Sequence, residues 1–205
     1  MKAKRMIALA TILMALSACG QPKTFTGAQL GGILLGSADA PAGLQYIAQG
    51  SGPQTIDQIS KDDAEKAKLN GFGFQSAYSS FYANTGAIAV LSQQTKNADP
   101  SSHVVAALGV VFKTPDGAHQ ALLLEHQNDV STGTNVQTIA VAALGDETIA
   151  ESGTQEGIPF PGYLVYWRDG NAIFGILVAG GPTASVTLDE ARNLASTVHG
   201  RAQKA

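Results

Sequence analysis

The feature that most restricts the fold of this chain is segment 163–178, in which two apolar runs flank the dipeptide Asp169-Gly170. An Asp-Gly pair between apolar runs favours a two-residue type I′ turn, so we predict a β-hairpin. This turn places Val165 opposite Phe174. Side chains alternate between the faces of a strand, so both faces of the hairpin are apolar. One face carries Tyr163, Val165, Trp167, Phe174, Ile176 and Val178, and the other carries Leu164, Tyr166, Ile173 and Leu177.

A hairpin with two apolar faces must be covered on both sides, whereas an antiparallel sheet often leaves one face in water. The simpler explanation is a central hairpin with helices on one face and a closing sheet or loop on the other. The alternative is a concave apolar surface that binds a lipid, another hydrophobe or a partner protein. Under this alternative, the candidate ligand contacts are Tyr163, Trp167 and Phe174.

Further elements follow from β-branched apolar runs, which favour strands, and from capping residues, which favour helix starts. We predict strands at residues 44–48, 87–93, 103–112, 136–141 and 147–151. We predict helices at residues 60–69, 114–128 and 187–198. Segment 72–82, rich in aromatic residues, is expected to be extended or mixed. This order of elements predicts an α+β fold, a single domain with a mainly antiparallel sheet and about three helices packed on it.

The N-terminal segment has the three parts of an export signal. It starts with the basic residues Lys2, Lys4 and Arg5, continues with an apolar run over residues 6–16, and ends in small residues before Cys19. As a helix the apolar run extends only about 16 Å, too short for a hydrocarbon core of roughly 30 Å. We therefore predict a cleaved signal and not a transmembrane helix.

The residues Leu16-Ser17-Ala18-Cys19 resemble the lipobox of bacterial lipoproteins. The resemblance implies cleavage before Cys19, which then carries a thioether-linked diacylglycerol and often an amide-linked third chain. Two or three fatty chains hold a protein firmly at a membrane. The alternative is cleavage after Ser17 by an ordinary signal peptidase, which would leave a soluble protein with an unmodified Cys19.

The lipobox divides the chain into a signal peptide at 1–18, a flexible tether at 19–29 and a single extracytoplasmic domain at 30–205. The lipid bilayer is then a partner through acylated Cys19. No acidic residue directly follows Cys19, which in cells with an outer membrane favours that membrane as the destination. In other cells the expected location is the outer face of the cell membrane.

Charge and cysteine content exclude several function classes. Three of the 13 basic residues leave with the signal while all 16 acidic residues stay, so the mature chain carries a net charge of −6. Nucleic acid is therefore not an expected partner. The single cysteine, Cys19, excludes a disulfide within the chain, a cysteine zinc cluster and a thiol redox pair.

The sequence lacks the common catalytic motifs. It contains no Gly-x-Ser-x-Gly elbow, no phosphate-binding glycine loop with Lys-Ser/Thr and no His-Glu-x-x-His. His119 and His126 share a helical face but are about 10.5 Å apart along the axis, too far to share a metal ion. His103 follows Ser102, but neighbours on a strand point to opposite faces. We expect no catalytic residue, no metal site and no cofactor.

Several short motifs of the mature part lie at matching places along the order of elements. They are Val111-Phe112 at a strand end, Ala118 in a helix, Leu144-Gly-Asp-Glu147, Trp167-Arg168-Asp-Gly-Asn171 in the hairpin and Leu194-Ala195 in the last helix. In this organisation residues 30–200 resemble small extracytoplasmic domains of bacterial lipoproteins and of the sensor regions of some membrane kinases. These domains share a cradle-like sheet also seen in Mog1/PsbP-like folds. The resemblance implies ligand or partner binding without catalysis and assigns no binding residue.

Three functions compete. The leading hypothesis is a membrane-anchored, non-catalytic cell-envelope lipoprotein that binds a small apolar ligand or an envelope protein. The first alternative is a structural or assembly accessory lipoprotein without a ligand, and the second is a hydrolase or metal enzyme with an unrecognised site. An apolar cavity would favour the ligand-binding lipoprotein, and a solid core beside an exposed apolar patch would favour the accessory lipoprotein. A cleft with converging His and Asp/Glu side chains would favour the enzyme.

Overall fold

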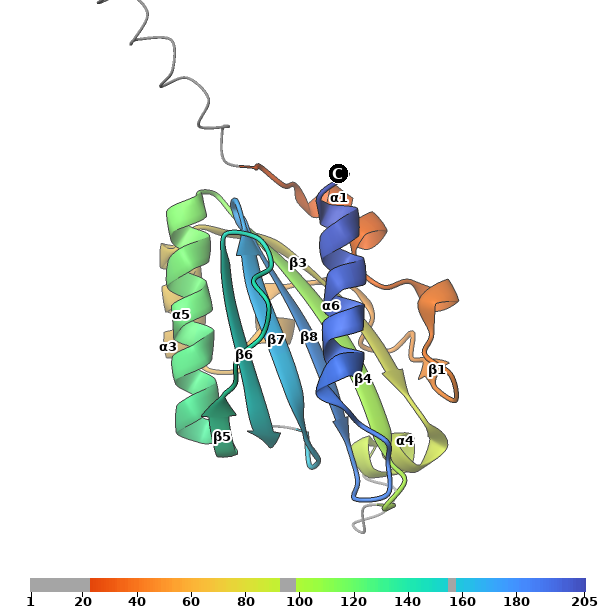
Figure 1. Ribbon diagram of the computed structural model, residues 1–205. Helices are drawn as coiled ribbons and strands as arrows, with labels where there is room; N and C mark the ends of the chain where they lie inside the picture. The colour runs from red at the N-terminus through yellow and green to blue at the C-terminus, as the bar shows by residue number, and fades with distance from the viewer. Residues whose placement is uncertain (1–22, 93–98, 155–157) are drawn as a thin grey trace, which may run out of the picture.

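The computed structural model describes residues 23–92, 99–154 and 158–205 (Figure 1). In these residues an 8-stranded antiparallel sheet has the order β1-β3-β4-β8-β7-β6-β5, and β2 also pairs with β3. The predicted signal peptide and Cys19 lie outside the described residues. Within the described part of the chain, no helix has both the length and the apolar character needed to cross a membrane.

The strands are β1 (Gln45–Tyr46), β2 (Gly52–Gln54), β3 (Phe74–Ala83), β4 (His103–Phe112), β5 (Thr134–Thr138), β6 (Glu147–Thr154), β7 (Pro161–Asp169) and β8 (Ala172–Gly180). The helices are α1 (Gly27–Ile33), α2 (Ile56–Ile59), α3 (Asp63–Gly71), α4 (Thr85–Leu91), α5 (Pro115–Thr132) and α6 (Leu188–Ala202), with a 3-10 turn at Ser37–Asp39. The α+β class and the single antiparallel sheet are confirmed. The expected number of about three helices is wrong, because the described residues form six. The three unforeseen helices, α1, α2 and α4, are too short to show helical periodicity in the sequence.

The expected strand at 87–93 is wrong, because residues 87–91 belong to helix α4 and residue 93 lies outside the described residues. A short apolar run does not by itself distinguish a strand from a buried helix. The deciding residue is Asn84, whose side chain accepts a hydrogen bond from Ala87 N over 3.0 Å and caps the helix. The ambiguous segment 72–82 supplies the strand instead, since most of it is β3, which pairs with β4 along its length.

Helices cover both faces of the sheet (Figure 1). Helices α6 and α1 pack on the face that carries Val165, Trp167 and Phe174. Helix α5, together with α2 and α3, packs on the face that carries Tyr166 and Ile173. The predicted assignment of hairpin residues to two apolar faces is therefore confirmed. The cover consists of helices on both sides, which differs from the expected helices on one face and sheet or loop on the other.

The hairpin register differs from the predicted one. The turn residues are Gly170 and Asn171, one position later than expected, with φ +57° at Gly170 and no positive φ at Asn171. This pattern belongs to a type II′ turn, which places glycine first. Val165 consequently lies opposite Ile176 and not opposite Phe174. The partner shifts by two residues, which leaves every side chain on its predicted face.

The folded domain begins before residue 30. Phe25, which we assigned to the tether, is only 3% exposed and packs edge-on against Phe174 with ring centroids 5.5 Å apart. Helix α1 follows at once, with a capping box formed by Thr26 and Gln29. Residues 23–29 therefore belong to the folded domain. Phe25 and helix α1 pack on one face of its sheet.

Candidate functional site

Two of the three predicted ligand contacts fill the core. Trp167 and Phe174 are both 0% exposed and stack with ring centroids 5.5 Å apart. The small residues Ala191 and Ala195 of α6 are buried in the same core. Tyr163 is half-buried and lines a groove between the ends of β6, β7 and β8. Full burial leaves the Trp167 and Phe174 rings no surface for a ligand.

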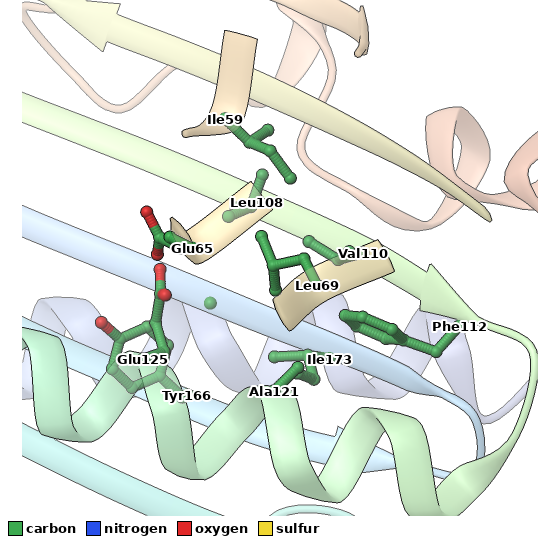
Figure 2. A pocket seen from close by; sticks show the side chains of 11 residues that line it. Ile59, Glu65, Leu69, Leu108, Val110, Phe112, Ala121, Glu125, Tyr166 and Ile173 are labelled. Carbon is green, nitrogen blue, oxygen red and sulfur yellow. The ribbon is translucent and has the colours of Figure 1, made fainter. Parts of the chain in front are cut away.

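A hollow of about 50 Å³ lies on the other face of the sheet, between the sheet and helices α3 and α5 (Figure 2). Its apolar lining comes from Ile59, Leu69, Leu108, Val110, Phe112, Ala121 and Ile173, with Gly175 beside them. Three polar side chains, Glu65, Glu125 and Tyr166, gather at one end, as Figure 2 shows. The hollow thus has an apolar end and an acidic end.

Helix α5 carries Glu125 to the hollow. The helix starts at a cap in which the Thr114 side chain accepts from Gly117 N over 3.1 Å. Ala118 and Ala121 then face the sheet with 0% and 3% exposure. Residues four apart lie on one helix face, so Glu125 follows Ala121 on the side turned toward the hollow. The apolar residues on this side of α5 are therefore followed directly by the carboxyl group of Glu125.

The β7 and β8 strands shape the floor of the hollow. Tyr166 of β7 lies opposite Gly175 of β8. A Cβ atom at residue 175 would lie 3.1 Å from the Tyr166 ring, so glycine allows the ring to lie close to the strand. This placement directs the phenol toward helix α5.

The two glutamates at the acidic end have different surroundings. Glu65 accepts hydrogen bonds from Asn128 Nδ2 over 2.8 Å and from the hydroxyl of Ser60. Glu125, by contrast, has no hydrogen bond and no ion pair with any residue of the described ranges. Among the polar side chains of the hollow, Glu125 is therefore the one best placed to form a hydrogen bond or ion pair with a ligand.

Further acidic groups adjoin this end of the hollow. The Tyr166 hydroxyl donates to Asp129, and His126 Nδ1 is hydrogen-bonded to Glu151 Oε1. Glu151 is 0% exposed, and its Oε2 has no hydrogen-bond partner among the described residues. We call Glu65, Glu125, Asp129 and Glu151 the acidic cluster.

Burial and the proximity of other acids raise the pKa values of two members of the acidic cluster, Glu125 and Asp129. Burial raises the pKa of Glu125 to about 8, and the charges of Asp129, Glu65 and Glu151 act in the same direction. Burial also raises the pKa of Asp129 to about 6, although the Tyr166 hydrogen bond opposes this shift. At neutral pH Glu125 is therefore mostly protonated, because an ionised carboxylate here would be poorly solvated and repelled by its neighbours.

Sequence patterns singled out none of the four acids of the cluster, and of their neighbours only His126 and Tyr166. The two histidines of α5 have separate partners, since His119 pairs with Glu147 over 2.7 Å and His126 pairs with Glu151. No group of three or more metal-ligating side chains occurs in the part of the chain that the structure describes. A usable signal was the spacing of Glu125 and Asp129, which continue the buried stripe of α5.

No known protein family matches the sequence, and no curated protein matches it either. Among solved structures, the extracellular domain of PknH from Mycobacterium tuberculosis is similar, with a TM-score of 0.57 and 15% identity, over 90% of this chain and 100% of that chain. The two chains share a fold. The predicted resemblance to extracytoplasmic domains is thus confirmed for the architecture. At 15% identity the PknH-like fold transfers no binding residue, so the hollow rests on its own geometry.

Proposed function

We propose that the mature chain is a membrane-anchored, extracytoplasmic binding domain that holds a small apolar molecule in the hollow between α3, α5 and the sheet. The observation that carries this proposal is the hollow itself, which is apolar at one end and acidic at the other. The PknH-like fold supports an extracytoplasmic location, and the lipobox supports an anchor at Cys19. The proposed role is non-catalytic.

The two faces of the sheet support this function differently. On the α6 face, the rings of Trp167 and Phe174 and the small side chains of α6 fill the core, as an accessory protein without a ligand would require. On the α5 face, Leu108 is only half-buried and lines unfilled space. An alkyl chain placed there would remove apolar surface from water, the main source of affinity for such ligands.

A hydrolase is the second candidate, because His126 and several carboxyl groups converge beside the hollow. A carboxyl with a raised pKa, such as Glu125, is suited to donate a proton at neutral pH. The binding proposal is better supported, because most of the described lining is apolar and none of it is histidine, serine, threonine or cysteine. Turnover of simple ester or glycoside substrates that is lost in Glu125→Gln would instead support the hydrolase.

Filling the hollow tests the binding function. Leu108→Trp places a large ring in the unfilled space and is expected to reduce binding of 1-octanol, measured by calorimetry, by at least about tenfold, equivalent to about 1.4 kcal/mol. Leu123→Trp is the matched control, because Leu123 lies on α5 with 40% exposure and does not line the hollow. Equal octanol binding by both variants, or no binding of octanol by the unaltered protein, would contradict the proposal.

The anchor is tested on the protein recovered from its own cell. Mass spectrometry of the mature N-terminus is expected to show an acylated Cys19, and Cys19→Ala is expected to release the domain from membranes. An unmodified N-terminus at Ala18 would show the alternative processing route and remove the anchor from the proposed function.

A further inference from the structure

The acidic end of the hollow indicates which class of apolar ligand it takes. Resting on the proposed binding function, we propose that the ligand carries a cationic head, as an alkylammonium does. Its chain lies against Leu69, Leu108 and Val110, and its cation lies beside Glu65 and Glu125 (Figure 2). The geometry thus divides one ligand between two chemically different ends of the same hollow.

The first support is an excess of acid without a matching base. The main charges that act on Glu125, Asp129 and Tyr166 within the described structure are carboxylates, and His126 supplies the one opposing charge. The neighbouring lysine of α3, Lys66, is already paired with Asp63 over 2.6 Å and Asp57 over 3.2 Å. A ligand cation would therefore meet acidic side chains that lack basic partners, and Glu125 would become ionised when the cation binds.

The second support is the presence of polar atoms that lack partners. Glu125 lines the hollow without a hydrogen bond or ion pair to any described residue. The fully buried Glu151 is held by His126 behind this end and does not line the hollow, so the support comes from Glu125. A carboxyl group that lines an apolar hollow without a partner would gain a charge-assisted interaction from a ligand cation.

The affinity for a cationic ligand is expected to depend on pH, whereas the affinity for a purely apolar ligand is not. The titratable groups that face Glu125 are Glu65 from α3, His126 and Asp129 from α5, Glu151 from β6 and Tyr166 from β7. A cation favours the ionised form of every carboxyl near it, so its binding releases protons and tightens as pH rises. A neutral alcohol with the same chain has no such dependence.

The experiment compares three probes with equal chains: octyltrimethylammonium, 1-octanol and octanoate. The charge of the quaternary ammonium does not change with pH, so any pH effect on its binding comes from the protein. We expect octyltrimethylammonium to bind at least about tenfold more tightly than octanol at pH 9 and to lose most of this advantage by pH 6, because Glu125 is then protonated and Asp129 is partly protonated. Octanoate is expected to bind most weakly at pH 9, because it meets like charge.

Glu125→Gln isolates the carboxyl at nearly constant shape. This variant is expected to lose at least about fivefold in affinity for octyltrimethylammonium at pH 9 and to keep its affinity for octanol. Asp189→Asn, which removes an exposed acid on α6, is the control and should change neither. Calorimetry of the unaltered protein in two buffers of different ionisation enthalpy measures the proton release directly and does not depend on how the variants fold.

The outcomes separate the two proposals. Octanol binding with no preference for the ammonium, or with a preference for octanoate, overturns the cationic ligand and leaves the proposed binding function intact. Failure of all three probes to bind overturns both. Ammonium binding that is unaffected by Glu125→Gln and releases no protons overturns the assignment of the cation to the acidic end.

Discussion

Asn171 and Phe25 exchange two hydrogen bonds across 146 sequence positions. Phe25 N donates to Asn171 Oδ1 over 2.6 Å, and Asn171 Nδ2 donates to Phe25 O over 3.2 Å. Nδ2 also donates to Phe112 O over 2.7 Å. One buried amide therefore joins the N-terminal segment, the end of β4 and the β7–β8 turn. It also explains the turn register, since Asn171 must occupy a turn position to reach both backbones.

Asn171→Ala is expected to lower the free energy of unfolding by about 2–4 kcal/mol, because it leaves buried backbone groups of Phe25 and Phe112 without partners. Urea denaturation measures the change. Asn193→Ala, at an exposed position of α6, is the control and should stay within about 0.5 kcal/mol of the unaltered protein. Similar effects of the two substitutions would contradict the structural role of Asn171.

Gly170→Ala and Gly200→Ala are expected to change stability in opposite directions. At residue 170, φ is +57° and a Cβ atom would lie 1.8 Å from Lys23 O, so alanine should cost about 2 kcal/mol or more. At residue 200, inside α6, nothing lies within 4 Å of a Cβ atom, so alanine should add about 0.5–1 kcal/mol. Thermal unfolding measures both, and a stabilised Gly170→Ala would show that the turn differs from the structure.

Phe174→Leu separates core packing from ligand contact. Phe174 is 0% exposed between Trp167 and Phe25, so the smaller side chain is expected to lower stability by about 1–3 kcal/mol. Octanol affinity should be unchanged, because the hollow lies on the other face of the sheet. A selective loss of octanol binding with unchanged stability would restore Phe174 as a ligand contact.

The stability of the protein without ligand is expected to fall as pH rises through the titration of Glu125. Folding raises the pKa of this acid from 4.5 to about 8, so its ionised form is disfavoured in the folded state. The contribution of Glu125 to stability is therefore lost between about pH 4.5 and 8 and does not change above that range. Glu125→Gln should be more stable than the unaltered protein by about 2–4 kcal/mol at pH 9 and similar to it at pH 4.5.

Urea denaturation at several pH values measures this difference. Asp129, whose pKa rises to about 6, contributes to the pH dependence of both proteins and largely cancels in the comparison. Asp189→Asn, whose side chain is 82% exposed in the unaltered protein, should follow the unaltered protein over the range. A stability difference between Glu125→Gln and the unaltered protein that does not vary with pH would contradict the raised pKa of Glu125.

Local patterns predicted the elements that carry strong local signals. The caps at Thr114 and Thr187 marked the starts of α5 and α6, and the alternation around Trp167 assigned both faces of the central hairpin. Short helices were missed for the opposite reason. In α4, seven apolar or small residues fit a strand as well as a helix, and only the cap at Asn84 and the pairing of β3 with β4 distinguish them.

The candidate site was less accessible to prediction than the fold. Trp167 and Phe174 were reasonable ligand contacts while the cover of their face was unknown, and α6 then packed on that face and closed it. The acidic cluster draws on α3, α5 and β6, which are far apart in sequence. Nothing in the spacing of Glu65 and Glu151 indicates that they meet near Tyr166.

The sequence by itself determined that this chain needs cover on both faces of one hairpin, that its net charge is negative, and that thiol chemistry is limited to Cys19. These properties depend on composition and on periods of a few residues, which local sterics and side-chain polarity govern. Only the tertiary structure decided which face of the sheet is filled by packed side chains and which face keeps a hollow. It also decided that Glu125 is an unpaired, mostly protonated acid, because burial and the proximity of charges arise only when distant segments pack together.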